Sequence, residues 1–277
     1  MGELLVKDIL IVVVIYNTPL EESLSLISLD QNCLKSDVFI YDNSLISNYQ
    51  NHLVSFRNLN IKYVHDATNP GVSKAYNTAA DFAFNNKKKL LLLLDQDTCL
   101  PENGIKEYLK AVNANPKMNL FAPMLKFNDK IYSPCNYYIH RGSHKKQFNT
   151  GVNSLKYTNF LNSGLLIKVD AFFKVKGYDE NIRLYFSDFE FVNRFKKEYQ
   201  EYYLVDMICN HELSSTDMSD AFKALQRFKI YCEDAKRASK SISLRLQYFI
   251  TLSLRAVKLS LYFKDLKFIM IFFSDFI

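Results

Sequence analysis

The chain has 277 residues, 48% of them hydrophobic and 23% charged, which excludes a globally disordered protein and allows one large α/β domain with an appendage. Its net charge of +6 suits an anionic ligand or an anionic membrane surface, and it carries no nucleic-acid-binding motif that would make nucleic acid a partner. Five scattered cysteines without a Cys-x-x-Cys pair indicate neither a disulfide scaffold nor a structural zinc site, and they are typical of a reducing compartment.

Apolar runs alternate with helical patterns in the first half of the chain. The first run, residues 9–16, is too short to span a bilayer and no cleavage site follows it, so we interpret it as a strand and not as a signal peptide. We expect strands at residues 9–16, 37–41, 61–64, 90–94 and 120–125, and helices at residues 19–33 and 73–85. The alternation predicts an α/β protein with a doubly wound, mainly parallel sheet flanked by helices.

Small polar or acidic residues follow the first four of these strands. They are Tyr16-Asn17-Thr18, Asp42-Asn43-Ser44, Asn69-Pro70-Gly71 and Asp95-Gln96-Asp97. Polar residues after strands are ordinary turn chemistry, but four such ends at one edge of a parallel sheet predict a nucleotide pocket. The chain has only 7 glycines and lacks both Gly-x-Gly-x-x-Gly and a Lys-bearing phosphate loop, so we do not expect a glycine cradle to hold the phosphates.

Asp95 and Asp97 follow five consecutive leucines, a pattern typical of a strand that is buried on both faces. Because the side chains of a strand alternate, both carboxylates leave its end on the same side. Two hard oxygen ligands in this place suit a divalent cation that bridges to phosphates. The alternative is an acidic loop start that caps a helix.

The order and spacing of these motifs resemble those of the family-two glycosyltransferases over roughly the first 215 residues. The Asp-Gln-Asp form, and Asn69-x-Gly71 followed by Ala75-x-Asn77, are similar to bacterial rhamnosyltransferases of surface polysaccharide assembly. The resemblance implies a GT-A fold, a nucleotide-sugar donor, a bound Mn²⁺ or Mg²⁺ ion and inversion at the anomeric carbon.

The resemblance also implies roles for single residues. Asp42 would contact the base, Asp95 the ribose or the sugar, and Asp97 the metal. His211 matches a histidine that approaches the metal and the diphosphate, with a purely structural histidine as the alternative. Asn162-Ser163-Gly164 matches the element that frames the donor sugar, with a plain turn as the alternative. The whole implied donor-binding set is Tyr16, Asn17, Thr18, Asp42, Asn69, Gly71, Lys74, Asp95, Gln96, Asn162, Ser163 and Gly164.

A second acidic centre follows at Ser187-Asp188-Phe189-Glu190. Asp188 is expected to open a helix, where the helix dipole favours an anion, so a cap or an ion pair with Arg194 is one reading. By the resemblance, Asp188 is the general base that accepts the proton of the acceptor hydroxyl. Many relatives carry a second acid directly before the base, and here that residue is Ser187, so Glu190 stays open as the alternative base.

Residues 126–159 are polar and rich in Tyr, Asn, Lys and His, and we expect a β-hairpin or a mobile loop. His140 and His144 are four residues apart, but without a third ligand they are interpreted as solvated surface. Arg141 and Lys145 are weak candidates for acceptor or diphosphate binding.

We place a domain boundary between residues 217 and 218, because long helical patterns follow it. Arg237 and Arg255 are separated by about five helical turns and so project the same way, and Lys240 and Lys258 repeat this. The residues largely opposite them are Ile242, Leu246, Phe249, Ile250, Val257 and Leu261. The pattern predicts a basic amphipathic helix that lies on an anionic membrane or packs on the catalytic domain. The apolar end, residues 264–277, is expected to dip into a membrane or to mediate self-association.

Together these features predict an inverting glycosyltransferase. The resemblance implies transfer of L-rhamnose from dTDP-L-rhamnose to a growing, lipid-linked surface polysaccharide, by a cytoplasmic protein bound to the inner face of the bacterial plasma membrane. A UDP-sugar-dependent transferase of the same fold and a catalytically inactive sugar-nucleotide- or glycan-binding scaffold are the alternatives. A nucleotidyltransferase is disfavoured, because no glycine-rich loop follows the first strand.

Overall fold

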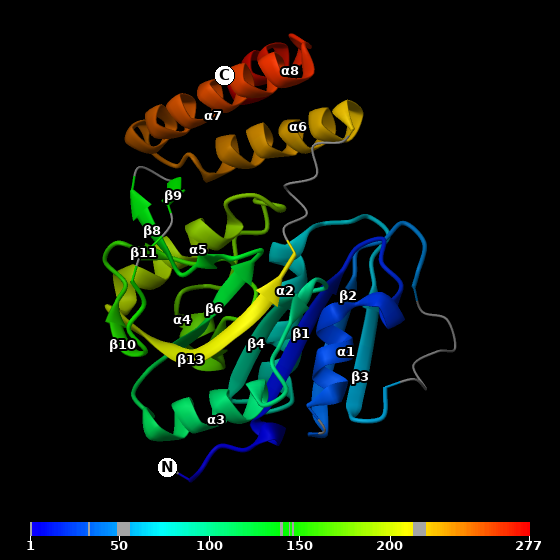
Figure 1. The fold of residues 1–277 in the computed structure, drawn as a ribbon, viewed down its shortest axis with the longest axis vertical. Coiled ribbons are helices and arrows are strands. Elements are labelled where there is room, and N and C mark those ends of the chain that lie inside the picture. The colour runs from blue at the N-terminus through cyan, green and yellow to red at the C-terminus, as the bar shows by residue number, and fades with distance from the viewer. Residues whose placement is uncertain are drawn as a thin grey trace.

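The computed structural model describes residues 2–32, 34–48, 56–138, 141–143, 145, 147–212 and 220–277. A ten-stranded sheet runs through the molecule in the order β10-β13-β6-β12-β4-β1-β2-β3, with β5 added to β13 and β7 to β6 (Figure 1). Its strands are β1 (Ile9–Ile15), β2 (Ser36–Asp42), β3 (Leu59–His65), β4 (Leu90–Asp95), β5 (Thr98–Cys99), β6 (Leu120–Phe127), β7 (Lys130–Ser133), β10 (Gly151–Ser154), β12 (Leu166–Lys168) and β13 (Glu201–His211).

Helices cover both faces of this sheet, and a small second sheet lies beside it (Figure 1). The helices before residue 213 are α1 (Leu24–Gln31), α2 (Val72–Asn85), α3 (Gly104–Ala114), α4 (Val169–Lys174) and α5 (Ser187–Glu198). The small sheet has the order β11-β8-β9, with β8 (Cys135–Tyr138), β9 (Arg141–Ser143) and β11 (Thr158–Asn159). Two 3₁₀ turns, Val6–Asp8 and Leu20–Glu22, precede β1 and α1.

The expected α/β architecture is confirmed, and the sheet is parallel through β4, β1, β2 and β3. Every residue of β1 is buried, because its alternate side chains enter two different cores. Val12 and its neighbours on that face pack with α2 and α5, whereas Val13 and its neighbours pack with α1 and α3. The antiparallel β12 lies between β4 and β6, so the sheet is mixed on that side.

Two expected elements differ from the structure. The helix expected at residues 19–33 begins later, at Leu24, because Ser23 caps it by accepting the N–H of Leu26, and Cys33 lies outside the described residues. Residues 126–159 form β7 to β11 and not a single hairpin. His140 and His144 lie outside the described residues, as does the side chain of Arg141, while Lys145 is described without a partner that would support a binding role.

The C-terminal extension contains α6 (Ala221–Ala238), α7 (Ile242–Phe263), α8 (Lys267–Ile271) and a π turn, Phe272–Phe276. These helices pack on one another and on Ile182 and Phe186 in the segment before α5; we call residues 2–212 the catalytic part where the site is discussed below. The expected boundary at residues 217/218 lies outside the described residues. Among the described helices, none combines the length and the hydropathy that crossing a bilayer requires.

The single basic amphipathic helix expected here is wrong. The chain turns between α6 and α7, so Arg237 and Arg255 lie on different helices and helical spacing does not align them. Arg237 pairs with Glu233, and the guanidinium of Arg255 lies 4.3 Å from the ring centroid of Tyr231. These two basic side chains therefore serve contacts within the extension.

Candidate active site

The carboxyl ends of β1 and β2 border an open cavity of about 710 Å³. It is lined by Tyr16, Asn17, Pro19, Asn43, Ser44, Leu45, Ile46, Ser47, Asn48, Ala67 and Asn69. Three of the residues expected to bind the donor, Tyr16, Asn17 and Asn69, are in this lining. Both asparagines adopt positive φ, at 50° and 49°, a conformation that asparagine tolerates better than most residues.

Asp42 is fully buried and is not part of the cavity lining. Its carboxylate accepts hydrogen bonds from the N–H of Ser44, from Asn48 and from the Tyr63 hydroxyl. Burial acts to raise the pKa of Asp42, but these hydrogen bonds outweigh it and lower the pKa below its usual value. Asp42 therefore holds the loop that lines the cavity.

Asn43, the next residue, was not among the expected site residues. It is 3% exposed and lines the cavity, and its side-chain oxygen has no hydrogen-bond partner among the described residues. A buried amide oxygen without a partner is costly, and a donor group on a ligand would satisfy it. The sequence signal was present, since Asn43 belongs to the same strand-end tripeptide as Asp42.

Asp95, Asp97 and His211 form a cluster whose ligand atoms lie within 4.8 Å of one another. Asp95 ends β4, Asp97 lies in the turn after it, and His211 ends β13, which pairs with Thr98 of β5. This pairing explains how a histidine more than a hundred residues away reaches the acidic turn. His211 Nδ1 lies 2.8 Å from the Thr98 hydroxyl and 3.4 Å from Asp97 Oδ1.

The cluster has the properties of a cation site. Asp97 Oδ1 is buried and has no hydrogen-bond partner among the described residues. Burial, together with the neighbouring charge of Asp95, raises the pKa of Asp97 to about 7, and burial lowers the pKa of His211. Two crowded carboxylates and a neutral imidazole form a ligand set that suits Mn²⁺ or Mg²⁺. The residues therefore fit the divalent ion.

Hydrogen bonds connect this cluster to the cavity and to the loop before β12. Gln96 accepts the N–H of Tyr16 and donates to the hydroxyl of Thr18. The Asp95 N–H donates to the Ser163 hydroxyl. Gly164 has φ +82°, and a Cβ there would lie 2.5 Å from Pro123, so this close packing requires glycine. Thus Thr18 and Ser163 lie beside the acidic turn that contains Gln96, and their expected role in donor binding stays a prediction.

Asn162 extends this connection toward the second acidic centre. Its side-chain oxygen accepts the Tyr178 hydroxyl at 2.7 Å, and its amide lies 3.4 Å from the Ser187 hydroxyl at the start of α5. Tyr76, whose ring lies 5.2 Å from that of Tyr178, donates its hydroxyl to Asp95. A continuous polar and aromatic wall therefore joins the acidic turn to α5.

Gly71 and Lys74 make contacts that differ from direct donor binding. Gly71 has φ +97°, and a Cβ there would lie 2.0 Å from the carbonyl oxygen of Arg183, so only glycine allows this approach. The N–H of Val72 donates to the same carbonyl. Lys74 pairs with Glu180 at 3.2 Å and is not part of the cavity lining. Both residues therefore tie α2 to the segment that precedes α5.

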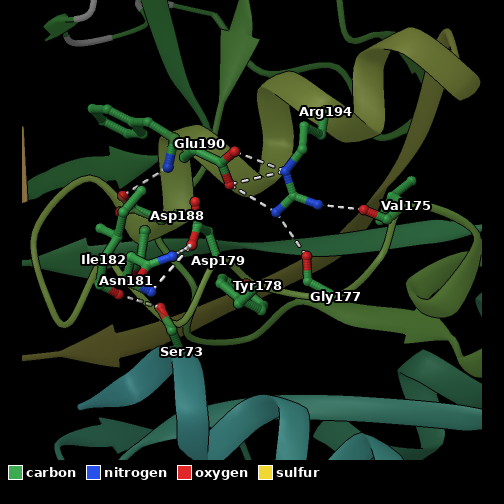
Figure 2. A network of polar contacts seen from close by, with 12 residues as sticks. Ser73, Val175, Gly177, Tyr178, Asp179, Asn181, Ile182, Asp188, Glu190 and Arg194 are labelled. Atoms are coloured by element: carbon green, nitrogen blue, oxygen red, sulfur yellow. Dashed lines mark hydrogen bonds and ion pairs between the residues drawn. The ribbon is translucent and has the colours of Figure 1, made fainter. Parts of the chain in front are cut away.

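Asp188 lies in the first turn of α5 and is half-buried. Its carboxylate accepts the N–H of Phe189 at 2.8 Å (Figure 2). Burial raises the pKa of Asp188 to about 7, the Phe189 N–H opposes this shift, and the charge of Asp95 adds to it. Because the Asp95 charge acts on both Asp97 and Asp188, the three carboxyl groups share one electrostatic neighbourhood.

The alternative reading of Asp188, as the ion-pair partner of Arg194, is wrong. Arg194 donates from Nε and Nη2 to the Glu190 carboxylate. It also donates from Nη1 to the carbonyl group of Val175 and from Nη2 to that of Gly177 (Figure 2). Lys240 also pairs with Glu190, with its Nζ 3.2 Å from Glu190 Oε1. The oxygens of Glu190 are therefore occupied by two cations, whereas no described lysine or arginine pairs with Asp188.

Comparisons with known proteins agree with this geometry. The sequence profile of Glycosyl transferase family 2 matches residues 10–172, more than half of the chain. A search of curated proteins gives no match. The structure of S. aureus TarS is similar with a TM-score of 0.59 and 16% identity over 88% of this chain, which spans 48% of that protein.

A second similar structure, S. aureus TarS 1-349 in complex with UDP-GlcNAc, gives a TM-score of 0.56 and 13% identity. The match covers 88% of this chain and 70% of that TarS chain. These likenesses concern the fold, and they confirm the expected GT-A architecture. With a matching family profile, a GT-A sheet and a cavity beside an acidic turn, this chain belongs to glycosyl transferase family 2.

Proposed function

We propose that this protein transfers a sugar from a nucleotide-sugar donor to an acceptor hydroxyl in one step, with inversion at the anomeric carbon. The observation that carries the proposal is the line of contacts, through Tyr76, Tyr178 and Asn162, that joins the Asp95–Asp97–His211 cluster to the start of α5, where Asp188 lies. One centre suits a cation beside a diphosphate, and the other is a carboxyl group of pKa about 7 without an ion-pair partner among the described residues. A general base works best when its pKa is near the working pH.

Asp97 and His211 would hold the divalent ion, which supplies positive charge for the leaving diphosphate. Asp188 accepts the proton of the acceptor hydroxyl while that oxygen bonds to the anomeric carbon, and the bond to the diphosphate breaks on the opposite face. Asn43 would accept a hydrogen bond from the nucleotide in the cavity, because its buried side-chain oxygen has no hydrogen-bond partner among the described residues. Ser163 holds the backbone of Asp95, so the acidic turn keeps its position during the reaction.

For the donor, we propose dTDP-L-rhamnose, which rests on the similarity of the Asp95-Gln96-Asp97 and Asn69-x-Gly71 motifs to rhamnosyltransferases. The acceptor in this proposal is a growing surface polysaccharide carried on a lipid at the inner face of the bacterial plasma membrane. The second candidate donor is a UDP-sugar, which the fold shared with the UDP-GlcNAc complex of TarS supports.

The test is release of nucleoside diphosphate by the purified chain from a panel of dTDP- and UDP-sugars, with Mn²⁺ and with or without acceptor glycans. We expect release from dTDP-L-rhamnose that depends on both the ion and Asp188. Asp129→Asn, in the exposed turn between β6 and β7, is the matched control, because Asp129 is fully exposed and belongs neither to the cavity lining nor to the cation cluster. Absence of release from every donor would favour the inactive scaffold.

A further inference from the structure

Helix α7 presents a stripe of large apolar side chains to solvent. Its members are Leu246, Ile250, Leu254, Val257 and Leu261, and their exposed fractions lie between 48% and 75%. They recur every three or four residues, so they share one side of the helix. The opposite side, with Tyr248, Leu252, Ala256 and Leu259, is buried in the contact with α6 and the catalytic part.

The end of the chain repeats this arrangement. Phe268, Phe272 and Phe276 are buried. On the other side, the exposed apolar residues of α8 and its surroundings are Leu266, Met270, Phe273 and Ile277, which are between 50% and 71% exposed. We call these four residues and the five of α7 the outer apolar stripes. Figure 1 shows α7 and α8, in orange and red, at the end of the molecule farthest from the N-terminus.

Positive charge is concentrated in the same region. Residues 218–277 contain eleven Lys and Arg against five Asp and Glu, which equals the net charge of +6 of the whole chain and leaves residues 1–217 neutral. Helix α7 contains no acidic residue at all. Lys258, Lys264 and Lys267 are exposed and lie on or directly after the helices that carry the stripes. The surface of a soluble monomer rarely combines a large exposed apolar area with such an excess of positive charge.

We infer that the outer apolar stripes dock on an anionic lipid surface, with α7 and α8 lying in the plane of the bilayer interface. Charge decides between this partner and a second copy of the chain. Two copies would bring two positive extensions together, whereas anionic headgroups attract the lysines while the acyl boundary accepts the apolar side chains. The inference is independent of the proposed reaction, because it rests on exposure and charge in the extension alone.

The test is flotation of the purified full chain with two kinds of vesicle, one of phosphatidylcholine alone and one with about a third of phosphatidylglycerol. We expect most of the protein to float with the anionic vesicles and little with the neutral ones, and added salt to weaken the binding. The variant with Leu254→Glu and Leu261→Glu is expected to lose at least about tenfold in partition, since it places two carboxylates in the stripe.

The matched control has Phe84→Glu and Val152→Glu, which change two exposed apolar residues of the catalytic part, on α2 and β10, in the same way. It is expected to bind like the unmodified chain. A third variant, Lys258→Gln with Lys264→Gln, changes charge without touching the stripes and is expected to bind anionic vesicles several-fold more weakly. Circular dichroism checks that every variant is folded.

Three outcomes would overturn the inference. The first is no flotation with anionic vesicles, and the second is an equal loss of binding in the catalytic-part control. The third is a dimer in light scattering that the stripe variant converts to a monomer, because the stripes would then cover each other.

Discussion

The cation cluster and Asp188 lie in one neighbourhood but are held in different ways. Asp95 ends β4, whose five leucines are buried, and Asp97 lies in the turn that follows; backbone pairing between β5 and β13 brings His211 to them. Asp188 follows a segment outside the sheet, and residues of the C-terminal extension hold that segment. Donor binding is therefore expected to depend on the sheet alone, whereas the catalytic base depends on the extension.

Asp234 of α6 is the main link between the extension and the base. It is fully buried, and its carboxylate accepts the backbone N–H groups of Arg183, Leu184 and Tyr185. Burial raises the pKa of Asp234, and these three hydrogen bonds oppose the shift. Lys240, just after α6, reaches Asp179 at 2.7 Å on the same segment. The extension thus fixes the chain directly before α5.

The largest expected effect separates the two centres. Asp188→Asn removes the proton acceptor while leaving the cation cluster intact, so transfer should fall by about a hundredfold to ten-thousandfold. Donor affinity, measured by calorimetry with Mn²⁺, should stay within about twofold. Steady-state transfer assays measure the first effect, with Asp129→Asn as control, and unchanged turnover would refute Asp188 as the base.

Asp97→Ala tests the other side of the comparison. Losing a charged ligand of the cluster removes an interaction of about 1.5–3 kcal/mol, which corresponds to roughly tenfold to a hundredfold weaker nucleotide binding in the presence of Mn²⁺. Calorimetric titration with dTDP and Mn²⁺ measures it, and Asp81→Ala, on the exposed side of α2, serves as control. Equal affinity with and without the Asp97 carboxylate would speak against the cation site.

Asp234→Ala should slow transfer without weakening donor binding. Three backbone N–H groups would lose their acceptor, and leaving each one unsatisfied costs about 1–3 kcal/mol, so the segment before α5 should loosen. We expect kcat to fall by about tenfold or more and the free energy of unfolding to drop. Glu233→Ala, one residue earlier on the same helix, is the control, and an unchanged kcat would show that the base does not depend on this anchor.

The last prediction changes no residue and concerns pH. Because the pKa of Asp188 is raised to about 7, the ionised base is depleted below that pH, and transfer should fall about tenfold per unit on the acid side. The measurement uses saturating donor and Mn²⁺, so that titration of Asp97 does not limit the rate. A profile that stays flat down to about pH 5 would mean that no group with this pKa controls the chemical step.

The two carboxylates of the cation cluster can be predicted from local pattern, whereas His211 was expected there only from the family resemblance. Buried leucine runs indicate a central strand, and residues that end parallel strands meet at one edge. The role of Asp42 was less predictable, since its burial depends on Tyr63 of the neighbouring strand and on Asn48 of the loop. The pairing of Arg194 with Glu190 and not with Asp188 follows from helical periodicity, because residues four apart lie on one face of a helix and residues six apart do not.

Contacts across long sequence distances were beyond the sequence argument. Nothing in the pattern around Asp234 shows that it binds backbone groups some fifty residues earlier. The break between α6 and α7 was missed because Ser239-Lys240-Ser241 does not contain the glycine or proline that usually marks a turn. That error aligned Arg237, Lys240 and Arg255 on one basic face, whereas in the structure they contact Glu233, Asp179 and Tyr231.

The most direct test of the shared site is a crystal structure with Mn²⁺ and a non-hydrolysable nucleotide sugar, with anomalous diffraction to locate the ion. The account predicts one anomalous peak between Asp95, Asp97 and His211, in contact with the diphosphate, and an anomeric carbon that faces the Asp188 carboxylate. An ion bound away from these three residues, or a sugar turned away from Asp188, would contradict it.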